Sequence, residues 1–223
     1  MLRNFAKKKN MHFISEDLEN YVAAHSQEEP LLLQQLNKET HQKILQPRML
    51  SGHFQGRVLS MLSKIIHPKH ILELGTYTGY ATLCLAEGLQ NDGTIDTIDI
   101  NEELEEIQEK YFNLSDYKGR IFQHIGNATE IIPTLNKKFD LVFIDADKEN
   151  YITYWNLIVP MMNKGGIILS DNVLWSGKVL EEVKKNDKST PILLEYNKMV
   201  NDDPRVETVL LPIRDGLTVS RVL

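Results

Sequence analysis

The sequence predicts an α/β protein with a doubly wound, mostly parallel sheet of seven strands and an antiparallel terminal strand. From Ile71 onward, short apolar runs alternate with segments of helical spacing, as in repeated strand–helix–strand units. Two β-rich runs, 205–212 and 216–222, close the chain, and the turn dipeptide Asp215-Gly216 between them predicts an antiparallel pair.

The elements are expected in a fixed order along one domain, 1–223, with a helical cover over 1–68 and an α/β core over 69–223. An arm over 1–14 precedes helices at 16–25, with Ser15 as N-cap, at 31–45 and at 54–66. Strands are expected at 71–75, 94–100, 120–126, 141–144, 165–170, 205–212 and 216–222. Helices are expected at 80–89, 102–114, 128–132, 150–162 and 191–200, with an insertion over 173–188.

Composition argues against nucleic-acid and membrane partners and against an intramolecular disulfide. The formal net charge of −6 argues against non-specific nucleic-acid binding, which depends on Lys and Arg. No apolar run reaches 18 residues, so neither a membrane span nor a membrane partner is expected. Cys84 is the one cysteine, which excludes an intramolecular disulfide, and its apolar neighbours predict a core position. We expect a cytoplasmic protein.

Polar oxygen ligands follow the two central strands. Asp145 follows the run 141–144, and Asp171 and Asn172 follow 165–170. The carboxyl ends of parallel strands share one edge of a sheet, so these side chains are expected to meet. Such ligands suit Mg²⁺, Mn²⁺ or Ca²⁺ rather than zinc. The alternative is that Asp145 is an N-cap and Asp171-Asn172 a turn.

Lys148 stands three residues after Asp145, so a helical turn beginning there would point both side chains to the same side. A lysine beside a divalent cation can serve as a general base. The alternative is a solvated surface lysine.

A glycine-bearing turn follows the first strand. Gly75 and Gly79 allow close backbone approach by a ligand, but Tyr77 stands where a dinucleotide-binding turn has its second glycine. A ring at that position leaves little room for a pyrophosphate. Asp99 ends the next strand, where a carboxylate can accept both ribose hydroxyls, although it could equally be the N-cap of the following helix. Together these features favour an adenosine-containing ligand without a pyrophosphate.

Five segments in this order resemble the cation-dependent, S-adenosylmethionine-dependent O-methyltransferases of the caffeoyl-CoA and catechol type. They are LELGTYTGY (72–80), IDIN (98–101), FIDADKENY (143–151), GGIILSDNVLWSG (165–177) and LPIRDGL (211–217). The resemblance covers roughly 47–223 and implies the class I methyltransferase fold, which is Rossmann-like.

The resemblance also implies roles for individual residues. The metal ligands fall on Asp145, Asp171 and Asn172, and the catalytic lysine falls on Lys148. Arg214 falls on the substrate side. Independently of the resemblance, Trp175 is a candidate substrate-lining ring because it lies in the insertion over 173–188. The cofactor contacts fall on Met49, Ser51, Glu73, Gly75, Tyr77, Gly79, Ala81, Asp99, Ala128 and Asp145.

Some positions depart from the family pattern. Ala81 stands where the catechol branch has a hydroxyl, and Arg214 and Ser176 replace a Gly and an Asn common in the plant enzymes. The pair Ala146-Asp147 is similar to the caffeoyl-CoA branch. Gln55 matches, with Met49 and Ser51, a segment that closes over cofactor and metal in the family.

The leading hypothesis is methyl transfer from S-adenosylmethionine to one hydroxyl of a vicinal aromatic diol, free or as a CoA ester, assisted by a divalent cation. A nicotinamide-dependent oxidoreductase and a non-catalytic adenosine-ligand binding protein are the alternatives. The family resemblance suggests a homodimer.

Overall fold

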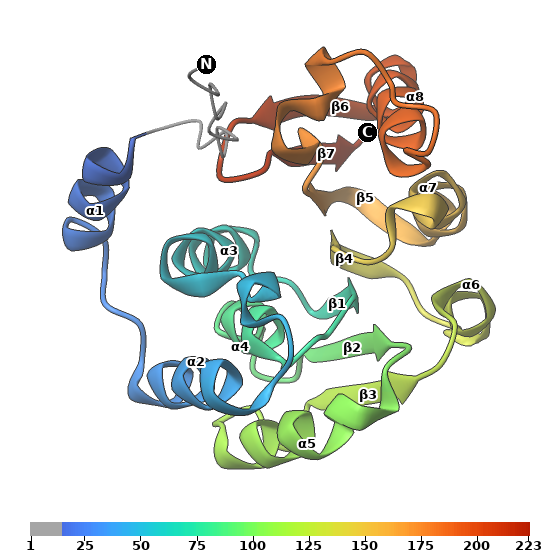
Figure 1. The fold of residues 1–223 in the computed structure, drawn as a ribbon. Coiled ribbons are helices and arrows are strands. Elements are labelled where there is room, and N and C mark those ends of the chain that lie inside the picture. The colour runs from blue at the N-terminus through green and yellow to red at the C-terminus, as the bar shows by residue number, and fades with distance from the viewer. Residues whose placement is uncertain (1–14) are drawn as a thin grey trace, which may run out of the picture.

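The computed structural model describes residues 15–223 and contains a seven-stranded sheet in the order β3-β2-β1-β4-β5-β7-β6 (Figure 1). The strands are β1 (His70–Leu74), β2 (Thr94–Asp99), β3 (Ile121–Ile125), β4 (Phe139–Ile144), β5 (Met162–Asp171), β6 (Val206–Leu211) and β7 (Leu217–Val222). β1 to β5 pair in parallel, whereas β7 runs antiparallel to β5 and to β6. The predicted fold class is therefore confirmed. The predicted arm over 1–14 lies outside the described residues.

Helices cover both faces of the sheet (Figure 1). They are α1 (Glu16–Ala24), α2 (Leu31–Lys43), α3 (Gly52–Ile66), α4 (Tyr80–Ala86), α5 (Glu105–Leu114), α6 (Ala128–Ile131), α7 (Tyr151–Ile158) and α8 (Ser189–Asp202). Short 3₁₀ turns connect them: η1 (Pro47–Met49), η2 (Glu102–Leu104), η3 (Ile132–Thr134), η4 (Lys148–Asn150), η5 (Val159–Met161) and η6 (Trp175–Leu180).

Alternation along the strands divides the core into two layers. Leu141 and Phe143 of β4 face the layer that contains α2 to α5, whereas Val142 and Ile144 face the layer of α6 to α8. All four side chains are fully buried. Because successive side chains of a strand point to opposite faces, a continuous apolar run is what a strand covered on both faces requires.

Two predicted helices end earlier than expected. The helix predicted over 150–162 ends at Ile158, because Pro160 has no amide hydrogen to continue it, and Met162 instead begins β5. The helix predicted over 80–89 ends at Ala86. Gly88 follows it, and a Cβ there would lie 2.2 Å from the carbonyl carbon of Ser63 in α3. The two helices therefore pack too closely there for a side chain.

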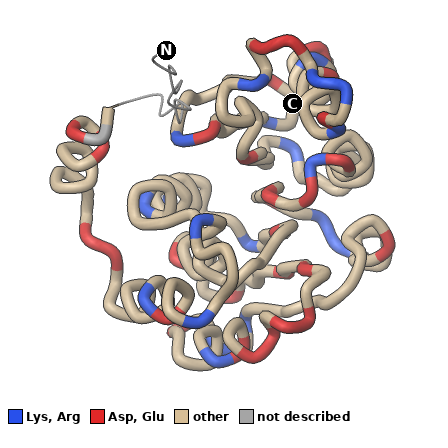
Figure 2. Tube along the Cα trace, viewed as in Figure 1, with Lys and Arg blue, Asp and Glu red and all other residues tan. Residues whose placement is uncertain are grey.

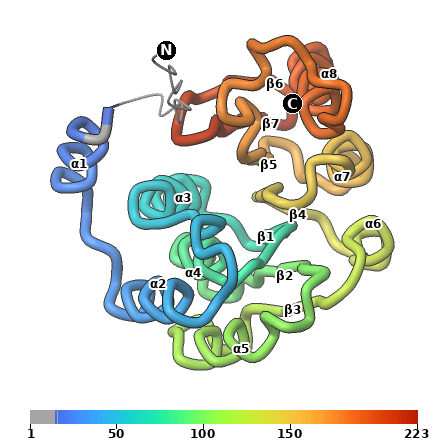
Figure 3. The backbone as a smooth tube through the Cα atoms, viewed as in Figure 1, coloured from blue at the N-terminus to red at the C-terminus, as the bar shows by residue number. Residues whose placement is uncertain are grey.

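The N-terminal helices lie over the α3–α5 side. Ser15 caps α1 as predicted, its hydroxyl accepting the amide of Leu18. The tube in Figure 3 shows α1 set apart from the sheet and joined to α2 by an extended segment. Over the described residues, Figure 2 shows basic and acidic positions interspersed along the trace. No described helix is both long and apolar enough to cross a membrane.

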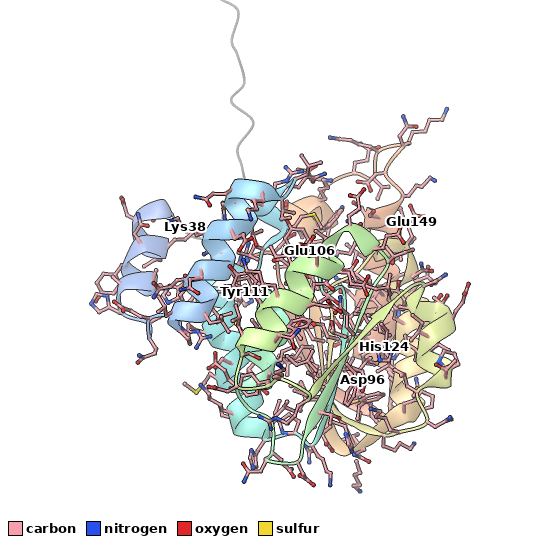
Figure 4. All side chains as sticks on the ribbon, turned by 90° about the horizontal axis from the view of Figure 1, so that it is seen from below. Lys38, Asp96, Glu106, Tyr111, His124 and Glu149 are labelled. Atoms are coloured by element: carbon pink, nitrogen blue, oxygen red, sulfur yellow. The ribbon has the colours of Figure 1, made fainter. Side chains whose placement is uncertain are left out.

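Glu39 ties α2 to α5. Its carboxylate accepts hydrogen bonds from Lys110 at 2.5 Å, from Tyr111 at 2.7 Å and from Lys43 at 2.8 Å. Figure 4 shows Tyr111 on α5 beside α2. The hydrogen bond from Lys110, followed by those from Lys43 and Tyr111, lowers the pKa of Glu39 to about 2.

This tie predicts a pH-dependent stability. Because folding lowers the pKa of Glu39, its contribution is complete above pH ~4.5 and is lost as the pH falls towards ~2. Glu39→Gln should lower the free energy of unfolding at pH 7 by about 1 kcal/mol, since both lysines are half exposed and screened. Urea titrations at pH 7 and pH 3 should show the difference shrinking at pH 3. The control is Glu109→Gln on the exposed face of α5. A difference that is equal at both pH values would contradict the assignment.

Candidate functional site

The predicted site residues gather at the carboxyl ends of the parallel strands. Gly75 follows β1, Asp99 ends β2, Asp145 follows β4 and Asp171 ends β5. The chain leaves β1 towards β2 and β3, then returns to place β4 on the other side of β1. Open α/β sheets bind their ligands at such a reversal of strand order.

In the turn after β1, other parts of the chain pack directly against Gly75 and Gly79. A Cβ on Gly75 would lie 2.1 Å from the carbonyl oxygen of Asp145, and one on Gly79 would lie 2.5 Å from the Phe112 ring. Both glycines have positive φ, 93° and 88°. The sequence alone explains these glycines by the approach of a ligand. The packing of the residue after β4 and of α5 also requires glycine at both positions.

Asp99 organises the same turn. Its carboxylate accepts the amide of Tyr77 at 2.6 Å and the amide of Asn101 at 2.9 Å. Tyr77 has a left-handed backbone, with φ at 51°. Asn101, not Asp99, is the N-cap of η2, so the N-cap alternative for Asp99 is wrong. Each carboxylate oxygen can still accept a further donor.

Glu73 is a fully buried carboxyl beneath this turn. Its Oε2 accepts the hydroxyls of Thr82 and Thr97, while its Oε1 has no hydrogen-bond partner. Burial raises the pKa of Glu73 to about 8, although the two threonine hydrogen bonds oppose the shift. A buried oxygen without a donor is costly, so a donor from a ligand would be favourable here.

Two further cofactor-side predictions are small buried residues. Ala81 lies in the first turn of α4, and Ala128 is the first residue of α6. Their exposed fractions are 7% and 8%. Neither side chain brings a polar group to the site.

Asp171 and Asp145 lie close enough for their charges to interact. Burial first, then the charge of Asp145, raises the pKa of Asp171, while Gln55 and Lys148 oppose the shift. Asn172 has a left-handed backbone, with φ at 58°, and its backbone N–H donates to Asp171 Oδ1 at 2.8 Å. Two carboxylates whose charges interact, one of them buried, favour a cation nearby.

Lys148 is buried rather than solvated, with 8% of its surface exposed, so the surface-lysine alternative is wrong. Its ammonium donates to Tyr151 Oη at 2.6 Å and to Asp145 Oδ1 at 3.3 Å. The Tyr151 hydroxyl in turn donates to the carbonyl oxygen of Asp171 at 2.9 Å. The turn η4 therefore aims Lys148 at the ends of both β4 and β5.

The segment from Pro47 to Gln55 comprises η1 and the beginning of α3, and it reaches the site through Gln55. Gln55 is 2% exposed, and its Nε2 donates to Asp171 Oδ2 at 2.5 Å. Met49 is 57% exposed, and Ser51 is partly exposed at the start of α3. Arg214 donates to the carbonyls of Leu50 and Ser51 and to Gln55 Oε1.

Trp175 opens η6, within the predicted insertion, and has φ at 48°. Its indole Nε1 is buried without a hydrogen-bond partner. Lys178 lies over its ring, with Nζ 5.1 Å from the ring centroid. A partly buried aromatic ring with an unpaired N–H can pack against an aromatic ligand and donate a hydrogen bond to one of its oxygen atoms.

The site residues fit a cation and an adenosine cofactor. Asp145, Asp171 and Asn172 provide oxygen ligands only, which suit Mg²⁺ or Mn²⁺. The described residues contain no group of three or more His, Cys, Asp or Glu that could hold a metal, so Asn172 is needed to complete the set. Asp99 and the free Oε1 of Glu73 provide acceptors for a cofactor. These assignments remain predictions.

Sequence reasoning underestimated two residues. Tyr151 contacts Lys148 and the Asp171 backbone, and its i, i+3 spacing from Lys148 was the available signal. Asp215 accepts the amide of Ser176 and so holds the start of η6. Only the folded hairpin brings Asp215 to that place.

Comparison with known proteins gives one consistent result. The model of a family described as O-methyltransferase matches residues 23–223. Caffeoyl-CoA O-methyltransferase 5 of Nicotiana tabacum is 35% identical over 184 residues, which cover 78% of this chain and 77% of the relative.

Solved structures agree. The SAH-bound methyltransferase PaMTH1 of Podospora anserina has a TM-score of 0.85 and 26% identity, covering 93% of this chain and 94% of that one. An O-methyltransferase of Bacillus cereus in complex with SAH has a TM-score of 0.85 and 25% identity, covering 93% and 97%.

The contacts of Tyr151 predict an effect on turnover. Tyr151→Phe keeps the ring but removes the oxygen that accepts from Lys148, so the lysine loses its nearest polar partner. We expect turnover to fall about tenfold, the equivalent of one hydrogen bond to a charged group. Cofactor affinity, measured by calorimetry, should not change. Tyr117→Phe, between α5 and β3, is the matched control, and equal turnover of the two variants would contradict a role for the hydroxyl.

Proposed function

The chain belongs to the O-methyltransferase family and is an S-adenosylmethionine-dependent enzyme, and from that premise we propose its acceptor and its metal dependence. The proposed reaction is methylation of one hydroxyl of a vicinal aromatic diol, with a divalent cation at Asp145, Asp171 and Asn172. The observation that carries the proposal is the buried cluster in which Lys148 contacts Asp145 beside Asp171.

The chain's own residues supply orientation and proton transfer. Asp145, Asp171 and Asn172 would hold the cation, whose positive charge would favour the phenolate form of a diol bound beside it. Lys148, in its neutral form, would accept the phenolic proton at Nζ, held in place by Tyr151. The bond from oxygen to the methyl carbon forms as the bond from that carbon to the cofactor sulfur breaks. Such an in-line transfer depends on alignment, which can contribute ~7–11 kcal/mol.

The burial of the cluster supports the same chemistry. Asp171 and Lys148 are 2% and 8% exposed, so little water would compete for the reacting atoms. The positive charge of the sulfonium disappears in the transition state, which favours a dry site. Asp99 and Glu73 are proposed to hold the ribose and the methionine end of the cofactor.

The two alternatives are set aside. Family membership assigns methyl transfer, not hydride transfer, to the chain, and Tyr77 occupies the place where a dinucleotide-binding turn needs glycine. A non-catalytic binding protein is equally disfavoured, since the family is one of enzymes.

The relative from Nicotiana tabacum is named for a CoA ester, and we propose that this chain accepts aromatic diols either free or as CoA esters. Trp175 would line the acceptor. We also propose a homodimer, with the N-terminal helices and the segment over 173–188 as contacts.

Metal removal tests the proposal first. Excess EDTA should abolish transfer of radiolabelled methyl groups to catechols and to their CoA esters, and Mg²⁺ or Mn²⁺ should restore it. Asp171→Ala should remove activity while the cofactor still binds, because Asp171 faces the cation rather than the adenosine. Full activity in excess EDTA would refute the cation mechanism.

The role of Lys148 is tested separately. Lys148→Met should keep cofactor affinity but reduce turnover by ~10²–10⁴-fold, as for other positioned bases. The loss should shrink for nitrocatechols, whose hydroxyl arrives ionised and needs no base. Turnover of wild type and variant is compared across catechols of graded acidity. A constant ratio near one would show that Lys148 takes no proton.

A further inference from the structure

The turn between β6 and β7 is fixed against the segment that follows Asp171. The amide of Val173 donates to Gly216 O at 3.3 Å, and the amide of Leu174 donates to Asp215 O at 2.9 Å. Gly216 has φ at 88°, and a Cβ there would lie 2.5 Å from Leu174 Cγ. The turn is therefore part of the wall around the carboxyl end of β5.

Arg214 extends from this turn to the opposite wall of the site. Its Nη1 donates to Leu50 O at 3.4 Å, to Gln55 Oε1 at 2.8 Å and to Ser51 O. Its backbone is left-handed, with φ at 47°. A guanidinium is a cationic donor, so these are charge-assisted contacts.

Gln55 passes this constraint to Asp171. A side-chain amide accepts on its oxygen and donates on its nitrogen, and Arg214 has donors only. The contact with Arg214 therefore fixes the Gln55 oxygen, which leaves the NH₂ group facing Asp171, where it donates to Oδ2 at 2.5 Å. Without Arg214 the amide can turn over and withdraw this donor.

We propose that Arg214 is a positioning residue that holds the Pro47–Gln55 segment closed over the site and, through Gln55, orients the Asp171 carboxylate. The predicted role of Arg214 as a substrate contact is thereby replaced by one within the protein. The part that concerns Asp171 rests on the proposed metal site. The part that concerns the closed segment does not.

The first experiment measures the closed segment without metal or acceptor. In Arg214→Gln, backbone amides over 50–55 should exchange hydrogen about tenfold faster, and the Kd for SAH in EDTA should rise by a similar factor. Arg214→Lys keeps the positive charge, so its hydrogen-exchange rate and its Kd for SAH should lie between those of wild type and Arg214→Gln. The matched control is Arg221→Gln, an exposed arginine of β7 that pairs with Glu207 at 2.8 Å in the same hairpin. Circular dichroism checks that each variant is folded.

The second experiment tests the relay through Gln55. Arg214→Gln and Gln55→Ala should each raise the Mg²⁺ concentration for half-maximal activity, and the double variant should be no worse than Gln55→Ala alone. Additive effects would refute the relay. If the enzyme needs no metal, the proposed cation mechanism fails, while exchange and SAH binding still decide the closure.

Two outcomes would overturn the inference. Arg214→Gln could leave exchange and SAH affinity unchanged and raise KM only for diols that carry a carboxylate. Arg214 would then bind the acceptor, as the family resemblance first suggested. No change in any of these quantities would equally refute a positioning role.

Discussion

The site depends on keeping three charged groups together at the ends of neighbouring strands: the buried carboxylate of Asp171, the partly exposed carboxylate of Asp145 and the buried ammonium of Lys148. The parallel pairing of β4 with β5 brings Asp145 and Asp171 to one edge. Burial, and after it the charge of Asp145, raises the pKa of Asp171. The ammonium of Lys148 offsets part of the repulsion between the two carboxylates. The Tyr151 hydroxyl holds Lys148 in place by accepting a hydrogen bond from its ammonium and donating one to the carbonyl oxygen of Asp171. Breaking a buried charge pair costs far more than an exposed one, so the surrounding elements are constrained to keep this cluster dry and in register.

The elements outside the sheet serve that constraint from two sides. The Pro47–Gln55 segment supplies Gln55 as a donor to Asp171, and the β6–β7 turn holds both this segment and the start of η6 through consecutive residues, Arg214 and Asp215. The antiparallel strand pair thus does more than extend the sheet. It places a tight turn beside the carboxyl end of β5.

Part of this arrangement could be predicted because it follows from strand order. Asp145 and Asp171 each end an apolar run, and parallel strands bring such ends to one edge whatever the sequence separation. The contacts of Gln55 with Asp171 and of Arg214 with Gln55 join residues 116 and 159 positions apart. No periodicity links such pairs, because they depend on how helices and a hairpin pack across the sheet. Lys148 lies between these two cases. Its contact with Tyr151 follows from their i, i+3 spacing, whereas the contact of Tyr151 with the carbonyl oxygen of Asp171 depends on how the chain folds.

The polar atoms left unpaired identify where the fold is completed by ligands. Four buried side-chain atoms of the described residues lack a partner, and two of them, Glu73 Oε1 and Trp175 Nε1, belong to residues of the candidate site. Each such atom costs about 1–3 kcal/mol. The acceptor on Glu73 suits a cationic donor, and the donor on Trp175 suits an oxygen atom of a ligand. A ligand that pairs with either atom binds only the folded state. The groups that confer specificity therefore also raise the free energy of unfolding when the site is filled.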